Sequence, residues 1–388
     1  MKPVISFNNT KCHNCLKCLK ACPQDAISIV NEVVHIDEDK CIHCDVCLLA
    51  CVEKKLSVKS AHLHQSLDEF DYKVALMPTA ILSDIKTYDD LGHIVAAIKK
   101  LGFDEVVQYS DIEGSLYREG IKYSKEHEGV FINPMCPTIN RMIERDFPTL
   151  VDHLLPFDYP VEVAAKLIRK KYKDRNIGIF SLCECVGKMT LAKQPFDNQE
   201  SNIDYAISIS HIFPAINKLK NQDREEVKVS QDGVKSIVAD LYTNDTTKTI
   251  SVEGKRQCRT ALDLIEFDQL KNIKLVSLYA CYQGCIGGYY LWNNPFEGCI
   301  NVESMFSCLD KSNITLEKED YFKIHDVEDE SVNYKERIIW FKKVNSILEK
   351  LPQFDCGSCG FANCRNLAIS IAKGEVDESL CRVKKVTK

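Results

Sequence analysis

The stretch CHNCLKCLKACP, residues 12–23, places four cysteines at intervals of three, three and four residues and follows the last one with proline. The stretch CIHCDVCLLAC, residues 41–51, repeats the same cysteine spacing. Two four-cysteine runs with this spacing are specific enough to indicate iron-sulfur clusters rather than zinc ribbons or free thiols.

Both runs resemble those of bacterial two-cluster ferredoxins. The resemblance implies two 4Fe-4S clusters, with the fourth cysteine of each run binding the neighbouring cluster. Val52 stands where the second run would carry proline, which removes a stiffening residue but no ligand. The implied ligand sets are Cys12, Cys15, Cys18 and Cys51 for one cluster, and Cys41, Cys44, Cys47 and Cys22 for the other.

Composition limits the possible functions. The chain has 388 residues, enough for two or three domains, and its formal charge of -6 offers no basic surface for nucleic acid. No apolar run approaches the length of a membrane span, and the N-terminus lacks the apolar segment of a signal peptide. We therefore expect a cytoplasmic protein without nucleic-acid or membrane partners, whose twenty cysteines serve mainly as metal ligands.

Cysteine density divides the chain into three parts. Eight cysteines lie before residue 52, eight lie between residues 136 and 308, and four lie from residue 356 onward. We predict a two-cluster ferredoxin domain (α+β) over 1–65, a central α/β domain over 66–345, and a small α-helical 4Fe-4S domain over 346–388.

The central part alternates short apolar strands with amphipathic helices. KVALM (73–77), EVVQY (105–109) and NIGIFSL (176–182) are strand-like, LGHIVAAIKKLGF (91–103) has helical spacing, and residues 149–172 are predicted to be mostly helical. The alternation predicts a parallel α/β sheet, and cysteines follow the strand ends, where ligands collect in such sheets.

The last four-cysteine set encloses a predicted helix. Leu367, Ala368 and Ile371 fall on one face of this helix, and Gly374 is placed to end it. The segment resembles the single-cluster domain of corrinoid iron-sulfur proteins, which implies a 4Fe-4S cluster. A four-thiolate zinc site is the alternative that spacing leaves open. The set is Cys356, Cys359, Cys364 and Cys381.

Three separated central stretches carry further cysteines: INPMCPTINRM (132–142), FSLCECVGKM (180–189) and YACYQGCIGG (279–288). Together they resemble the three signature loops of diiron hydrogenases. The first loop offers a cysteine before proline, the second a cysteine with lysine three residues later, and the third two cysteines four apart before Gly-Gly. The matching residues are Cys136, Pro137, Cys185, Lys188, Cys281, Cys285, Gly287 and Gly288.

The resemblance implies the H-cluster of that family. A 4Fe-4S cubane would be bound by Cys136, Cys185, Cys281 and Cys285. Cys285 would bridge to a diiron subcluster that carries carbonyl, cyanide and a dithiolate amine. Lys188 would donate a hydrogen bond to a cyanide, which suits a flexible ammonium in a dry pocket.

The sequence departs from the family at the expected proton route. Met135 stands where catalytic members carry a second, proton-relaying cysteine. Cys183 and Glu184 replace a Met-Pro pair before Cys185, so each is a candidate relay; the alternatives are a packing thiol and a surface charge. Bulky aromatics follow Gly288, either crowding the diiron pocket or simply forming core: Tyr289, Tyr290 and Trp292.

These features predict a divergent, sensory-type hydrogenase that interconverts H2 with protons and electrons at a low rate, and that serves H2 or redox sensing. The alternative is an electron-transfer or assembly protein that keeps the cubane but lacks the diiron subcluster. Expected partners are a ferredoxin-like or other redox protein, the diiron-cluster maturases and a separate signalling protein. Three cysteines match no loop and are predicted to be structural: Cys258, Cys299 and Cys308.

Overall fold

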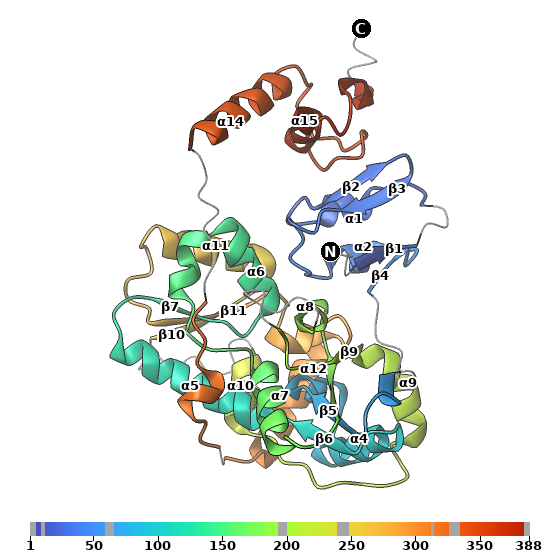
Figure 1. Cartoon of the computed structure of the whole chain (residues 1–388), viewed down its shortest axis with the longest axis vertical. Coiled ribbons are helices and arrows are strands. Elements are labelled where there is room, and N and C mark those ends of the chain that lie inside the picture. The colour runs from blue at the N-terminus through green and yellow to red at the C-terminus, as the bar shows by residue number, and fades with distance from the viewer. Residues whose placement is uncertain are drawn as a thin grey trace. The chain divides into compact units, whose positions relative to one another are not determined.

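The computed structural model describes residues 5–8, 12–58, 66–192, 200–238, 248–311, 314–325 and 334–383. The chain forms two compact units: Met1–Lys59 together with Glu328–Lys388, and Ser60–Val327 (Figure 1). The first unit thus joins both ends of the chain. The three predicted domains remain a prediction; their expected boundary at residue 345 falls inside helix α14 (Tyr334–Leu348).

The N-terminal part of the first unit has an internally repeated architecture. Two short helices each carry the third cysteine of a run, and each is entered through a residue in the left-handed backbone region, Leu16 or Asp45. Two antiparallel strand pairs, β1 with β4 and β2 with β3, complete a ferredoxin-like α+β fold, as predicted. The elements are β1 (Ile5–Phe7), α1 (Lys17–Ala21), β2 (Ile27–Val30), β3 (Val33–Ile36), α2 (Val46–Ala50) and β4 (Leu56–Val58).

The C-terminal part of this unit is helical. It comprises α14, α15 (Cys364–Lys373) and the 3-10 helix η7 (Glu378–Leu380). Leu367 and Ala368 are fully buried in its small core, and Gly374 ends α15 with a φ of 80°. The predicted helix and its end are confirmed.

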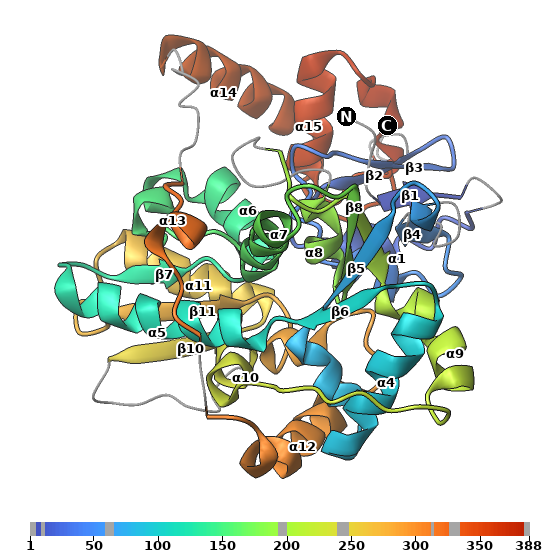
Figure 2. The same cartoon turned by 60° about the horizontal axis from the view of Figure 1, so that its bottom comes forward.

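The second unit contains a four-stranded parallel sheet with the order β6-β5-β8-β9. The three predicted strands are confirmed as β5, β6 and β8, and β8 is buried along its whole length, as expected for a strand covered on both faces. Figure 2 shows β5, β6 and β8 side by side. The strands are β5 (Tyr72–Met77), β6 (Glu105–Gln108), β8 (Ile177–Cys183) and β9 (Tyr205–Ser208).

A second parallel sheet has the order β10-β11-β7. Its strands are β7 (Phe131–Asn133), β10 (Thr249–Glu253) and β11 (Leu275–Tyr279). The α-helices of this unit are α4 (Tyr88–Lys100), α5 (Ser110–Glu126), α6 (Pro137–Asp146), α7 (Pro160–Lys171), α8 (Val186–Leu191), α9 (Ile209–Leu219), α10 (Gln231–Ile237), α11 (Lys255–Glu266), α12 (Pro295–Met305) and α13 (Lys318–Tyr321). The 3-10 helices are η1 (Thr79–Asp84), η2 (Pro148–His153), η5 (Gly284–Gly287) and η6 (Phe306–Cys308).

The predicted α/β class is confirmed. Residues 149–172 are mostly helical, as predicted, in two pieces: η2 ends at His153 and α7 begins at Pro160, with non-helical chain between them. Pro156 and Pro160 explain the break, because proline disfavours helical backbone at the residue before it. Among the described helices, none is long and apolar enough to cross a membrane.

Candidate iron-sulfur and diiron site

The central cysteines lie where parallel strands end. Cys136 follows β7 and is the N-cap of α6, whose first residue, Pro137, is suited to a helix start. Cys185 follows β8 and is the N-cap of α8. Cys281 and Cys285 follow β11. All three loops therefore leave the carboxyl ends of strands, where α/β sheets place their ligands.

The structure places these four half-buried cysteines in two neighbouring pairs, Cys136 with Cys285 and Cys185 with Cys281. Burial raises the pKa of the Cys285 thiol, and the charge of Cys136 contributes to the rise. Burial likewise raises the pKa of Cys185, with a contribution from Cys281. Bound iron favours the thiolate form and would offset this rise. The donor set therefore fits a 4Fe-4S cubane, and the assignment of these ligands stays a prediction.

Lys188 is the unusual side chain of this site. It lies one turn into α8 and is only 7 % exposed. Burial alone would lower its pKa, but the nearby Glu184 carboxylate, with smaller contributions from Tyr109 and Cys285, raises the pKa well above the ordinary lysine value. A buried ammonium beside Cys285 fits an anionic ligand bound next to that cysteine.

Glu184 is buried and is not the surface charge considered as one alternative. Its exposed fraction is 1 %, and its Oε1 lies 2.7 Å from Lys188 Nζ. The angles are not those of a hydrogen bond, and neither carboxylate oxygen has a hydrogen-bond partner among the described residues. Such a carboxylate is costly to bury, so the Lys188 charge is what keeps it in place.

The carboxyl ends of three neighbouring strands contribute to a buried polar cluster, which we define as Thr79, Tyr109, Glu113, Glu184 and Lys188. Lys188 Nζ donates to the Tyr109 hydroxyl over 3.4 Å, and Thr79 donates to Glu113. Burial raises the pKa of Glu113 to about 7.

Three members of this cluster were not predicted from the sequence. Thr79 follows β5, Tyr109 follows β6, and Glu113 lies one turn into α5. The sequence did contain one signal for Glu113. It lies among the core-facing residues of α5, such as Ile112 and Leu116, and such positions are normally apolar.

The residues that depart from the family pattern are placed as follows. Met135 is buried. Cys183 is fully buried, its thiol lies 3.4 Å from the Ser181 hydroxyl, and burial raises its pKa to about 12. Its proton-relay role stays a prediction. Tyr290 is buried, whereas Trp292 is 53 % exposed and stacks on Phe213 at a ring distance of 4.4 Å.

The N-terminal cysteines group as the ferredoxin resemblance implies. Burial raises the pKa of Cys18 to about 11, and the neighbouring thiolates that add to the rise are those of Cys51, Cys12 and Cys15. Burial also raises the pKa of Cys47; Cys44, Cys41 and Cys22 add to the rise, followed by Cys18 of the other set. Cys22, Cys41, Cys44 and Cys47 line one pocket. The proximity of Cys51 to Cys18 and of Cys22 to Cys47 fits the exchange of fourth ligands between runs.

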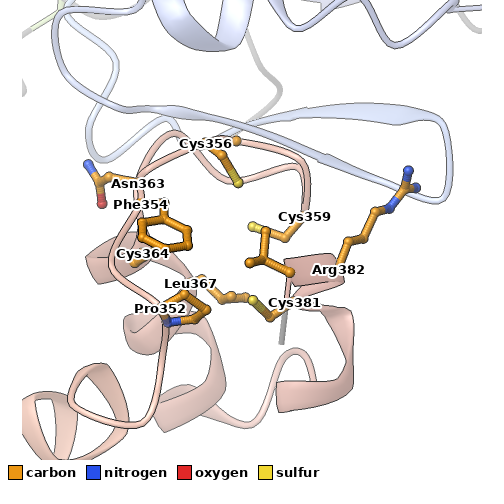
Figure 3. A pocket seen from close by; sticks show the side chains of 11 residues that line it. Pro352, Phe354, Cys356, Cys359, Asn363, Cys364, Leu367, Cys381 and Arg382 are labelled. Carbon is orange, nitrogen blue, oxygen red and sulfur yellow. The ribbon is translucent and has the colours of Figure 1, made fainter. Parts of the chain in front are cut away.

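The C-terminal cysteines line a common pocket. Figure 3 shows the sulfur atoms of Cys356, Cys359 and Cys381 facing the same space, and Cys364 also lines it. A four-thiolate zinc site and a 4Fe-4S cluster use the same four ligands, so the cluster assignment at this set stays a prediction.

The three remaining cysteines lie in different surroundings. Cys258 is fully buried on α11, and its thiol lies 3.3 Å from the Tyr279 carbonyl oxygen. Cys299 is half-buried and Cys308 is exposed. Burial of Cys258 is consistent with a structural role, and the role of the other two stays a prediction.

Family comparisons agree with this arrangement. Residues 72–221 match the model of the iron-only hydrogenase large subunit, C-terminal domain. Residues 4–52 match a 4Fe-4S dicluster domain, and residues 351–383 match an Fe-S cluster family. No curated protein sequence matches the chain.

Solved structures show the same fold. A FeFe-hydrogenase studied for oxygen inactivation of the 2Fe subcluster matches with 11 % identity and a TM-score of 0.51. Apo FeFe-hydrogenase HydA1 from Chlamydomonas reinhardtii matches with 10 % identity and a TM-score of 0.51. Each match covers 69 % of this chain and 99 % of the other. Residues 72–221 thus match a domain of the iron-only hydrogenase large subunit, and the chain shares the fold of FeFe-hydrogenases.

Proposed function

We propose that this protein interconverts H2 with protons and electrons, slowly, and that it serves H2 or redox sensing. The observation that carries the proposal is the buried Lys188 ammonium beside Cys285, at the junction of three cysteine-bearing loops. Its placement supports an anionic group at Cys285, because a buried cation needs a paired anion; in diiron hydrogenases that group is the diiron subcluster, where H2 would form or split.

The chain's own residues would have distinct roles. Cys136, Cys185, Cys281 and Cys285 would hold the cubane. Lys188 would donate hydrogen bonds to an anionic ligand of the diiron subcluster and fix its orientation. Glu113, whose pKa of about 7 makes both of its protonation states accessible at neutral pH, would hold or pass a proton.

A hydrogen-bonded chain leads outward from Glu113. The Thr79 hydroxyl donates to the Glu113 carboxylate, and Gln108 Nε2 donates to Thr79 Oγ1 over 2.7 Å. Gln108 is half-buried, so Glu113 lies two hydrogen bonds from partly solvated surroundings, although the Gln108 amide orients Thr79 and does not itself carry a proton. Electrons would pass through the 4Fe-4S clusters to a ferredoxin-like or other redox protein, or to a separate signalling partner.

The test is isotope exchange between D2 and water by protein produced with the diiron-cluster maturases. We expect measurable exchange by the parent and a loss of at least about a hundredfold in Lys188→Met, the size of effect expected when a positioned electrostatic donor is removed. Cys299→Ser is the matched control, because Cys299 matches no loop, and it should exchange at the parent rate. Equal exchange by Lys188→Met and the parent would contradict the proposal.

A second candidate is an electron-transfer or assembly protein that holds the cubane without the diiron subcluster. The observation that favours it is the contact of Glu184 with Lys188, because a carboxylate already compensates the ammonium. Glu184→Gln distinguishes the two. If the carboxylate is the lysine's only anionic partner, the variant leaves a buried charge uncompensated and loses stability even after maturation. If a diiron subcluster is present, the matured variant retains its stability.

A further inference from the structure

The C-terminal four-cysteine loop packs against the N-terminal domain within the first unit. Ile29 N, on the edge of β2, donates to the Gly360 carbonyl oxygen over 2.7 Å, and Ser28 forms an antiparallel bridge with Phe361. Val30 packs against the core of the C-terminal part. The loop thus extends the β2-β3 pair by one short segment, which satisfies an otherwise open strand edge.

Polar contacts reinforce this edge. Lys20 Nζ donates to the Ala362 carbonyl oxygen over 2.8 Å and also to that of Asp355. Asn363 Nδ2 donates to Asp25 Oδ2 over 2.6 Å. The two carbonyl groups that Lys20 binds flank the loop that contains Cys356, so one ammonium closes the loop at both ends.

The backbones approach so closely that only glycine fits at one position. A Cβ added to Gly360 would lie 1.7 Å from the Ile29 carbonyl oxygen, and the φ of Gly360 is 89°. Gly374 has a similar φ of 80°, but a Cβ there would meet nothing within 4 Å. A substitution at Gly374 therefore causes similar backbone strain but no clash with β2, which makes it a matched control for a substitution at Gly360.

The N-terminal contacts surround one particular cysteine. Lys20 and Asp25 lie two residues before and three residues after Cys22, and Ile29 lies on the next strand. Cys22 shares a pocket with Cys41, Cys44 and Cys47. Figure 3 shows the N-terminal ribbon, in pale blue, running beside the loop that carries Cys356.

We infer that Lys20, Asp25 and Gly360 hold the C-terminal cluster against the segment of Cys22, so that it exchanges electrons directly with the N-terminal cluster that Cys22 binds. The inference rests on the cluster assignments of the proposed function. One electron moves: the donor cluster passes from the 1+ to the 2+ state, the acceptor from 2+ to 1+, and no bond or proton changes. A low-potential one-electron donor supplies the electron. The two N-terminal clusters and the C-terminal cluster would then form one electron-transfer path.

The test uses the anaerobically reconstituted full chain and two readouts that do not depend on H2 chemistry. Hydrogen-deuterium exchange over residues 27–30 reports docking. Electron paramagnetic resonance of the dithionite-reduced protein reports whether the C-terminal cluster relaxes fast because another reduced cluster is near. Gly360→Val should raise amide exchange at least about tenfold, as expected when an edge opens locally, and should slow the relaxation several-fold. Gly374→Val should do neither.

Lys20→Met provides a second, milder variant that keeps the glycine backbone, and it should change both readouts in the same direction. Unchanged exchange in both variants would overturn the docking. Raised exchange with unchanged relaxation would overturn the electron route. Zinc or missing iron at the C-terminal cysteines would overturn the cluster assignment and the electron route together, whereas absence of a diiron subcluster would affect only the proposed hydrogenase activity.

Discussion

The buried carboxylate of Glu113 makes the stability of the protein depend on pH. Its pKa rises from 4.5 to about 7 because burial disfavours the charged form. The folded protein therefore binds this proton more tightly than the unfolded chain does. Below the unfolded-state pKa of Glu113, its ionisation costs no stability. The cost grows as the pH rises, and at pH values higher than the folded-state pKa it amounts to about 3 kcal/mol. Lys188, Glu184 and Thr79 are the neighbours that set this value.

Glu113→Gln should therefore stabilise the protein, and more so at pH 8 than at pH 5, because glutamine keeps an acceptor for Thr79 without the charge. Urea unfolding at the two pH values measures the difference. Glu126→Gln, at the exposed end of the same helix, is the control and should change little. An equal gain in the free energy of unfolding at both pH values would show that Glu113 does not titrate between them with a raised pKa. The same variant should slow isotope exchange if Glu113 carries protons.

Residue spacing identified candidate ligands but not their surroundings. Four cysteines in one short run are specific enough to suggest a cluster, so candidate ligands from Cys12 to Cys51 could be named from the sequence. The burial of Glu184 and the grouping of Tyr109 with Glu113 depend on which strands become neighbours. The local sequence pattern does not show which strands become neighbours.

At the scale of elements, two helices that begin at cluster cysteines pack through a glycine. Gly187 in α8 faces α6, and a Cβ there would lie 2.7 Å from Thr138 Oγ1. Thr138 is buried in α6, so its side chain has little room to turn away. Cys136 and Cys185 are the N-caps of these two helices, so close helix packing helps to position both residues.

Gly187→Ala should separate α6 from α8 and lower occupancy of the central cubane, while the other clusters remain. Iron analysis should then fall by about four atoms per chain, one 4Fe-4S cluster. The double variant Gly187→Ala, Thr138→Ala removes the clashing oxygen and should recover the iron. Full iron in the single variant would contradict the packing argument.

For the whole molecule, the cysteine sets predict four clusters. Anaerobic reconstitution with iron and sulfide should give about sixteen irons per chain before any diiron subcluster is added. Stable zinc at Cys356, Cys359, Cys364 and Cys381 would reduce that number and contradict the C-terminal assignment.

The global architecture was partly predictable. The alternation of strands and helices in the central part indicated parallel α/β sheets, and both sheets of the second unit are parallel. The sequence did not indicate that the two ends of the chain form one unit, because that contact rests on backbone groups of Ile29 and Gly360, which any sequence provides. The sequence shows Gly360, but nothing in it distinguishes this glycine from the others in the chain.

The central claim is that this chain carries a diiron subcluster at Cys285 beside Lys188. Infrared spectroscopy of protein produced with the dedicated maturases tests it most directly, because bound carbonyl and cyanide absorb where protein does not. We predict carbonyl and cyanide bands in the parent, with the cyanide bands shifted in Lys188→Met because the hydrogen bond is lost. A fully iron-loaded parent without these bands would contradict the account and leave the cubane-only function.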